Sequence, residues 1–503
     1  MEHYPLFSQK HYDRSYNDKG ESSGLLRETD EASSYSSETL YRNFVLMTIA
    51  FSLNHGAVTS CLAYASTELG DLLGSYSSGI LFVCFAITSF FFAKPVVSMI
   101  GPKNGLIIGV IGYSVYVVGF VLSIIFIYLS NDLEWITAVI SALIGGFAGG
   151  LLWTAQGRIF SRHSKLYGEV NRLPVTNVTS NFAGLFALIF LGTEMALKLV
   201  ATVIFLVLPS GAPFIVFFLY TAIAVVSCFS ITMLNDLDDK GTWDISYVAI
   251  SSHVGAAAKL VYKDKRMALI VPFQLAFGFT SSFVPYYVFG TVIADSPNLG
   301  ETYIGLLSAI IVFIGAITSV PASYLSNLYG KLVVVIVGGF CFAAAGFAFF
   351  LTSDESLGTW SYIIPLVVIY GIGRGVWEST NKAAIADFFV ESPDLVTSAY
   401  ASTAFFAGYG SAMGFFTFAS LDRLQMAGTI IFLSVAGNIC YYFSFTANIA
   451  EQRRIQDDKQ KFVTRRIAYA ERLQSLSSDL YDSDAPVVTS HREPSPYPPY
   501  RIL

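Results

Sequence analysis

Residues 331–351 read KLVVVIVGGFCFAAAGFAFFL, and no charged side chain follows Lys331 in this stretch. A helix rises 1.5 Å per residue, so about 20 apolar residues cross the roughly 30 Å hydrocarbon core of a bilayer. The stretch therefore predicts a membrane-spanning helix. Blocks of the same kind recur along the chain, and we expect about twelve of them: 40–62, 76–99, 105–129, 135–157, 178–206, 212–234, 267–293, 302–325, 331–351, 360–387, 397–418 and 424–448.

The composition agrees with a polytopic membrane protein. Of the 503 residues, 54% are hydrophobic and 13% are charged, whereas an average soluble chain carries about 25% charged residues. That is too little charge to cover a soluble surface, which excludes a cytosolic enzyme, a nucleic-acid-binding protein and a disordered chain. The five cysteines lie in apolar blocks without metal-ligand spacing, and no nucleophile–base pair is visible. We therefore expect no cofactor, no metal and no enzymatic activity, with the lipid bilayer as the surrounding partner.

A long stretch without a predicted span divides the chain into two halves. We expect a disordered cytosolic tail at 1–39, six-helix halves at 40–234 and 267–448, a central cytosolic loop at 235–266 and a cytosolic tail at 449–503. The last tail begins with the composition of a surface helix and ends in a Pro-rich segment that favours disorder.

Charges in the short loops predict the orientation, because Lys and Arg are enriched on the cytosolic side. One set of loops is basic: Lys103, Arg158, Arg162, Lys165, Arg172, Lys259, Lys263, Lys265, Arg266 and Lys331. The alternate set is acidic: Glu68, Asp71, Asp132, Glu134, Asp295, Glu301, Asp354 and Glu355. Arg423 in the acidic set and the acidic loop 388–396 run against this pattern. Both termini are therefore expected in the cytosol.

The two halves also resemble each other in sequence. Gly101 and Lys103 between the second and third spans correspond to Gly330 and Lys331 between the eighth and ninth. Gly149-Gly150-Leu151-Leu152-Trp153 at the end of span 4 likewise corresponds to Gly373-Arg374-Gly375-Val376-Trp377 in span 10. Two parallel copies of six helices form the major facilitator arrangement. We therefore predict an all-α membrane protein with the major facilitator fold and about 12 transmembrane helices.

Three motifs point to a family. The sequence GGLLWTAQG at 149–157, VYKDKR at 261–266 and GIGRGVW at 371–377, followed by Asn381, resemble motifs of the Unc-93 family, a branch of the major facilitators. The resemblance runs from about residue 40 to residue 450. That family carries Asp and Gln where this chain has Arg374 and Glu378. The resemblance implies regulation of an ion channel, ion homeostasis or escort of a receptor to endosomes.

Charged residues inside predicted spans are costly and mark candidate functional sites. In span 10, Arg374, Glu378 and Lys382 follow at four-residue intervals, which places them on one face of an α-helix. They predict either a buried ion pair that binds an anionic group or a structural pair that fixes span 10 to its neighbour. In span 5, Glu194 and Lys198 are spaced as an intramembrane ion pair. That span lies outside the cavity-lining set of the superfamily, so we expect this pair to be structural.

Several uncharged polar residues complete the candidate site. In major facilitators helices 1, 4, 7 and 10 line a central cavity, as the resemblance implies. Here each of them carries polar groups, which favours a polar cavity: Asn54 and His55, Gln156, Gln274, and Asn381 beside the charged residues of span 10. A histidine at this depth would suit proton coupling, although hydrogen bonding to a neighbouring helix is the simpler interpretation. Trp153 and Trp377 fit either the cavity or an interfacial anchor.

The loops and tails carry further candidates. Gly101 with Lys103, and Gly330 with Lys331, fit either a conformational latch or a mark of topology. Three segments in the tails have the spacing of sorting signals that adaptors bind: Tyr4 with Phe7, Glu21 with Leu25 and Leu26, and Tyr500 with Leu503. They favour an endosomal, lysosomal or vacuolar membrane over the plasma membrane.

Two functions remain open from the sequence. The charged, polar cavity favours a proton- or ion-coupled secondary transporter of a small solute. The resemblance favours an accessory protein that regulates an ion channel or escorts a membrane partner. Because the resemblance covers most of the chain, the sequence prediction is the accessory role, with transport as the alternative.

Overall fold

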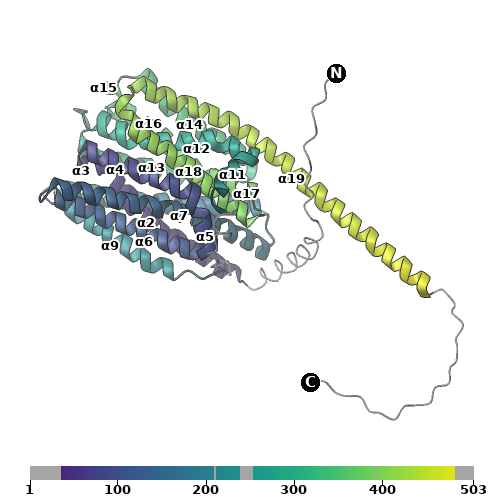
Figure 1. The fold of residues 1–503 in the computed structure, drawn as a ribbon. Coiled ribbons are helices and arrows are strands. Elements are labelled where there is room, and N and C mark those ends of the chain that lie inside the picture. The colour runs from purple at the N-terminus through teal and green to yellow at the C-terminus, as the bar shows by residue number, and fades with distance from the viewer. Residues whose placement is uncertain (1–34, 209–210, 238–252, 391, 482–503) are drawn as a thin grey trace, which may run out of the picture. The chain divides into compact units, whose positions relative to one another are not determined.

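A computed structural model describes residues 35–208, 211–237, 253–390 and 392–481, and every regular element within them is a helix. Figure 1 shows the long helices running side by side. Residues up to Thr446 form one compact unit, and residues from Ala447 onward form a second. The candidate site lies in the first unit.

The first helix group contains α2 to α9. Its elements are α2 (Ser37–Ala63), α3 (Ala65–Leu69), α4 (Asp71–Ile87), η1 (Thr88–Phe92), α5 (Ala93–Ile100), α6 (Pro102–Phe126), α7 (Asn131–Asn171), α8 (Val175–Val207) and α9 (Ala212–Thr232).

A short helix, α11 (Ala256–Lys263), precedes the second helix group, which begins with α12. Its elements are α12 (Lys265–Phe283), η2 (Val284–Ile293), η3 (Glu301–Tyr303), α13 (Ile304–Tyr329), α14 (Lys331–Leu351), α15 (Asp354–Leu357), α16 (Trp360–Val376), η4 (Trp377–Asn381), α17 (Lys382–Phe388), α18 (Pro393–Thr417), η5 (Phe418–Ser420) and α19 (Arg423–Tyr481).

The described helices follow the predicted spans closely. Eleven of them are long and apolar enough to cross a membrane. The predicted span at 397–418 is α18, a 25-residue helix rich in Ala, Gly, Ser and Thr, whose side chains are mostly buried against other helices. It is less apolar than the other eleven because it faces protein. The all-helical fold agrees with the sequence prediction.

Two helices extend well beyond the predicted blocks. The fourth span was expected to end at residue 157, but α7 continues to Asn171. The last was expected to end at residue 448, but α19 continues to Tyr481. In both cases a polar sequence follows the apolar block, and hydropathy alone marks where the apolar block ends, while the helix continues.

The two groups meet along helices that are distant in the sequence. In Figure 1, α2, α6 and α9 lie on one side and α12, α14 and α16 on the other. Helix α8 packs against α13, and α4 packs against α18. Glycines allow close approach within the second group: a Cβ on Gly278 of α12 would collide with the carbonyl oxygen of Ala407 in α18.

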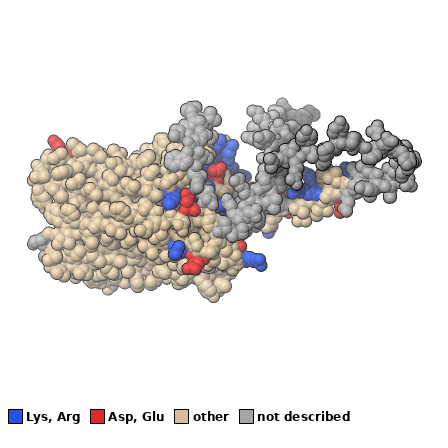
Figure 2. All heavy atoms as spheres, turned by 90° about the horizontal axis from the view of Figure 1, so that it is seen from below, with Lys and Arg blue, Asp and Glu red and all other residues tan. Residues whose placement is uncertain are grey.

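The outer surface is that of a membrane protein. Large apolar side chains stand exposed on many helices, for example Phe432 and Leu351 at 69% and 79% exposure. On the face shown in Figure 2, most of the bundle's surface is uncharged, and charged side chains gather towards one of its ends. We call the two ends the Gly101 end, where α5 meets α6, and the Ser130 end, where α6 meets α7.

Candidate functional site

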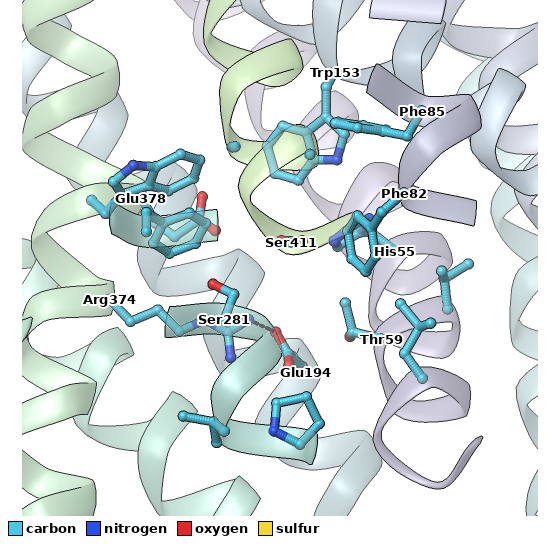
Figure 3. A pocket seen from close by; sticks show the side chains of 18 of the residues that line it. His55, Thr59, Phe82, Phe85, Trp153, Glu194, Ser281, Arg374, Glu378 and Ser411 are labelled. Carbon is cyan, nitrogen blue, oxygen red and sulfur yellow. Dashed lines mark hydrogen bonds and ion pairs between the residues drawn. The ribbon is translucent and has the colours of Figure 1, made fainter. Parts of the chain in front are cut away.

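A cavity of about 220 Å³ lies between the two helix groups. Figure 3 shows Arg374 and Glu378 on one side of it and His55, Thr59 and Phe82 on the other. The polar lining includes His55, Glu194, Lys198, Ser308, Arg374, Glu378, Asn381 and Lys382. Aromatic rings form much of the remainder, among them Phe82, Phe85, Tyr113, Trp153, Phe277 and Trp377.

Glu194 is the centre of a charged cluster in this cavity. Its Oε1 accepts a hydrogen bond from Lys198 Nζ at 2.7 Å, and its Oε2 accepts one from Arg374 Nη2 at 2.6 Å. Lys198 Nζ also donates to Ser308 Oγ at 2.7 Å. Glu194 and Lys198 lie on α8 of the first group, whereas Arg374 and Ser308 lie on α16 and α13 of the second. The cluster therefore joins the two groups.

This geometry corrects one expectation. The Glu194–Lys198 ion pair is present, but it was expected to lie away from the cavity, and both residues line it. The error has a physical reason, because the sequence does not show that α8 turns this face toward Arg374 of the other group. Ser308, which completes the cluster, carries no signal in the sequence that distinguishes it from other serines in apolar blocks.

The three charges of span 10 do not form one continuous series. Residues 377–381 are a π-helical segment, η4, inserted between α16 and α17. A π-turn closes hydrogen bonds from i to i+5 and so rotates the residues that follow it relative to an unbroken α-helix. Arg374, before the segment, pairs with Glu194. Glu378, inside it, pairs instead with Lys382, 3.6 Å from Oε2 to Nζ. The four-residue spacing did not reveal this division.

Lys382 lies in an aromatic environment. Its Nζ is 4.4 Å from the ring centroid of Trp153 and 4.1 Å from that of Phe186, both in the first group. A cation over an aromatic face is stabilised by the ring quadrupole. Trp153 therefore belongs to the cavity, where it contacts a charge from the opposite group.

Trp377 is held in place by a network of buried amides. Its Nε1 donates to Gln274 Oε1 at 3.1 Å, and Gln274 Nε2 donates to Asn381 Oδ1 at 3.0 Å. Tyr441 donates a second hydrogen bond to that oxygen at 2.7 Å. The indole stacks on Phe277 with the ring centroids 3.6 Å apart. Trp377 and Asn381 thus line the cavity, and Gln274 supports them from behind.

The polar residues of span 1 have different surroundings. Asn54 points away from the cavity and donates to Val110 O, Ser114 Oγ and Ser227 Oγ, which fixes α2 to α6 and α9. His55 lines the cavity, and its ring lies 5.0 Å from that of Trp153. Among the described residues its Nδ1 has no hydrogen-bond partner.

Gln156 is fully buried but is not part of the cavity lining. Its two amide atoms have no hydrogen-bond partner within the described part of the chain. It was predicted to line the cavity because it lies on span 4, one of the cavity-lining helices of the superfamily. The structure brings Trp153 of the same helix to the cavity instead.

The two glycines of the proposed latch lie in turns at the Gly101 end, and Lys103 and Lys331 lie in the first turns of α6 and α14. Gly101 and Gly330 both have positive φ, 84° and 88°, which favours glycine. Lys331 donates to Asp387 Oδ2 at 2.6 Å and to the carbonyl oxygen of Thr176 at 2.7 Å. For Lys103 the structure records no hydrogen bond or ion pair to the described residues. The two loops, similar in sequence, therefore have different contacts.

Further contacts join the two groups at the Gly101 end. Thr179 donates to Asp387 Oδ1 at 2.7 Å, and Arg158 Nη1 donates to the carbonyl oxygen of Pro393 at 2.6 Å. Lys94 Nζ lies 3.9 Å from Asp394 Oδ1. Asp387 and Asp394 were not identified from the sequence, because neither lies in a motif that matches between the halves.

Some of the predicted residues lie in parts of the chain that the structure does not describe. Tyr4, Phe7, Glu21, Leu25, Leu26, Tyr500 and Leu503, the candidate sorting signals, lie outside the described residues. Among the residues that are described, no cluster of three or more His, Cys, Asp or Glu side chains has the arrangement of a metal site.

The family match and the similar proteins of known name agree with one another. Residues 43–415 match the Major Facilitator Superfamily. UNC93-like protein 3 of Arabidopsis thaliana is 25% identical over 336 residues, which cover 64% of this chain and 69% of that protein. Protein unc-93 homolog A of Xenopus laevis is 22% identical over 411 residues, covering 73% and 84%.

Solved structures share the fold. The proton:xylose symporter XylE bound to 6-bromo-6-deoxy-D-glucose superposes with a TM-score of 0.61 at 12% identity, covering 82% of this chain and 96% of that one. A bacterial homologue of the iron transporter ferroportin, in an outward-facing state with soaked iron, gives a TM-score of 0.57 at 14% identity, covering 81% and 98%.

Proposed function

The chain belongs to the Major Facilitator Superfamily as an Unc-93-like, multi-pass membrane protein, and from that premise we propose that it is a secondary transporter of a small solute. The observation that carries this proposal is the Glu194 cluster. Arg374 reaches Glu194 from the opposite helix group at 2.6 Å, inside the cavity. A charge buried in a membrane is costly, and such residues mark ion and substrate pathways.

The cluster has the properties of a contact that changes during transport. Lys382 also reaches across, to Trp153 and Phe186 of the first group. A solute or proton that competes for these groups weakens the contacts between the halves, which rock against each other in major facilitators. A proton or ion gradient would act through the ionisable residues of the same cavity, Glu194, Glu378 and His55.

The orientation is part of the proposal. Basic residues in the loops of the Gly101 end support a cytosolic position for that end and for both termini. The contacts of Asp387, Asp394 and Arg158 then close the cytosolic end of the bundle. The segments around Leu25 and Leu503 support sorting to an endosomal, lysosomal or vacuolar membrane through adaptors.

Regulation of an ion channel, or escort of a receptor, is the second candidate. It is favoured by the similarity to Unc-93 proteins over most of the first unit. In this role the cavity charges would stabilise the fold without moving a solute, and the activity would depend on a membrane partner.

A paired experiment separates the two functions. The tagged protein is crosslinked in its native membrane and purified, and stoichiometric partners are identified by mass. The purified protein is also reconstituted into vesicles, and uptake of a mixture of small metabolites is followed by mass spectrometry under an imposed pH or sodium gradient. Gradient-driven uptake of a solute supports transport, whereas one co-purifying channel or receptor without uptake supports regulation.

Variants make the flux measurement specific to the site. Arg374→Gln removes the charge that joins Glu194 across the cavity, and we expect it to abolish uptake. Arg423→Gln is the matched control, because Arg423 pairs with Asp354 at the Ser130 end, outside the cavity. Equal uptake by the Arg374→Gln variant and the wild type would refute the site assignment.

A further inference from the structure

Two oppositely charged groups in the cavity have hydrogen-bonding capacity that the protein does not use. Glu378 and Lys382 are 3% and 5% exposed, and both line the cavity. Their ion pair, 3.6 Å between Oε2 and Nζ, is too long for a hydrogen bond. Among the described residues, neither Glu378 Oε2 nor Lys382 Nζ has a hydrogen-bond partner.

The other charged groups of the cavity differ in this respect. Glu194 accepts one hydrogen bond on each carboxylate oxygen, and Lys198 and Arg374 are its donors. Lys382 Nζ, which has three N–H donors, contacts aromatic rings instead. Buried charged groups are ordinarily hydrogen-bonded as well as paired. The unused donor and acceptor, a few ångströms apart, therefore identify where a polar solute would bind.

We propose that Glu378 and Lys382 together bind a zwitterionic solute of the α-amino acid class, with its carboxylate on Lys382 and its ammonium on Glu378. This inference rests on the proposed transport function and names the solute class for the same cavity. The ammonium and carboxylate groups of an α-amino acid are bonded to the same carbon atom, so its two charges lie a few ångströms apart, as those of the Glu378–Lys382 pair do.

Charge complementarity favours a zwitterion over an ion of one sign. An anion on Lys382 would place a second negative charge beside the Glu378 carboxylate, and a cation on Glu378 would place a second positive charge beside Lys382. In a site of low dielectric such like-charge contacts are strongly unfavourable. A zwitterion satisfies both groups without adding net charge.

The rest of the cavity offers an apolar surface for the solute's side chain. Trp377 and Phe277, whose rings stack parallel to each other, both line the cavity. Phe82 of α4 lies on the side of the cavity opposite Glu378 (Figure 3). Trp377 is fixed by its hydrogen bond to Gln274. Rigid aromatic rings around a few polar groups are typical of small-molecule sites. We therefore expect amino acids with apolar side chains to bind most tightly.

The first test measures binding, independently of flux. The full-length protein is purified into lipid nanodiscs, and its melting temperature is measured with each of the twenty standard L-amino acids at millimolar concentration. The best zwitterion is then compared with its N-acetyl derivative, an anion, its methyl ester, a cation, and with glucose, a neutral polyol. We expect the zwitterion to raise the melting temperature and to bind at least tenfold more tightly than the three comparison compounds.

The second test uses single substitutions to change which ligand charge the site prefers. Glu378→Gln should weaken the zwitterion about tenfold and make the N-acetyl anion the better ligand. Lys382→Met should weaken it similarly and favour the methyl ester. The double variant Glu378→Gln/Lys382→Met keeps the pair neutral, so it avoids leaving one buried charge unpaired, and it should lose the preference for charged ligands. Arg423→Gln should bind as the wild type does.

The outcomes separate this inference from the transport proposal. Binding of a zwitterion without flux supports the site and refutes transport. Flux of other solutes, with no amino acid in the panel bound, supports transport and refutes the site. Tighter binding of glucose or of either single-charge derivative by the wild type would also overturn the inference, as would equal weakening of all compounds by Glu378→Gln. If a single variant fails to fold, the wild-type ranking and the double variant decide.

Discussion

Glu194 illustrates how one side chain can serve two helix groups. It is 1% exposed, and it accepts hydrogen bonds from Lys198 on its own helix and from Arg374 on α16. Two positive charges therefore depend on one carboxylate. Removing that carboxylate would leave both cations buried with no acid in hydrogen-bond contact, which is far more costly than never having buried the charges.

We expect Glu194→Gln to lower the free energy of unfolding by about 3–5 kcal/mol, the usual cost of breaking a buried ion pair from one side. Lys198→Met should cost less, about 1–2 kcal/mol, because Glu194 keeps Arg374 as its partner. Glu194 Oε1 and Ser308 Oγ each lose a donor, but no buried charge is left without an opposite charge. Both are measured by denaturant unfolding in mixed micelles. Equal losses for the two variants would contradict the view that Glu194 holds both cations.

The elements of this protein differ in how far the sequence predicts them. Uncharged blocks identify the helices, because the bilayer demands apolar side chains over a fixed length. The π-helical segment η4 leaves no such mark, since its residues, Trp377 to Asn381, would also fit an α-helix. Arg374, before this segment, pairs with Glu194 of the other group, whereas Glu378, within it, pairs with Lys382. Spacing predicts neighbours along one helix, and it does not predict which helix lies opposite.

Turns at the Gly101 end provide a test at this scale. Gly330 has φ 88° and ψ 151°, a region that only glycine adopts readily, and a Cβ there would meet no neighbour. Gly330→Ala should therefore cost about 1–3 kcal/mol from backbone strain alone. Gly428→Ala is the matched control: it lies within α19, also without neighbours, and should stabilise by up to about 1 kcal/mol. Loss of stability in both would point to side-chain crowding instead.

The contact between α8 and α17 gives a second test. Asp387 accepts hydrogen bonds from Thr179 of the first group and from Lys331. Asp387→Asn should weaken this closure and let a membrane-impermeant thiol reagent reach a cysteine placed at Thr403, in the cavity lining, from the Gly101 end. The native cysteines are replaced beforehand. The rate at which the reagent modifies this cysteine is measured. Arg423→Gln breaks an ion pair at the Ser130 end and should leave the modification rate unchanged. If Asp387→Asn also leaves it unchanged, the contacts of Asp387 do not act as a latch.

At the scale of the whole molecule, the fold and many residues of the site could be predicted from the sequence. The side chains with which those residues pair could not. The fold follows from repeated apolar blocks, and the charged residues stand out because charge is rare inside a span. Which charge meets which depends on contacts between helices far apart in the sequence, as with Glu194 and Arg374, which are 180 residues apart. Glu194 was expected outside the cavity and lines it, whereas Gln156 was expected to line the cavity and does not. A polar residue on a cavity-lining helix need not face the cavity.

The contacts between the two groups lead to a prediction about motion. If the groups rock against each other during transport, tying them together at the Gly101 end should stop it. Asn327 on α13 donates to Asn181 on α8 at 3.0 Å, and both side chains lie outside the cavity. We expect a reducible bis-methanethiosulfonate crosslinker, which forms a disulfide with each of two cysteines placed at these positions and releases sulfinate, to abolish uptake, and a reductant to restore it.

The control tests whether crosslinking itself is harmful. Ser123 and Thr137 lie on α6 and α7 of the same group, with their hydroxyl oxygens 2.9 Å apart. A crosslink between cysteines at those positions holds helices that move together, so it should leave uptake as in the wild type. Uptake that persists with Asn181 and Asn327 crosslinked would mean that the two groups do not separate at this end. The solute would then pass without a rocking motion of the groups, and the Glu194 cluster would hold them together throughout transport.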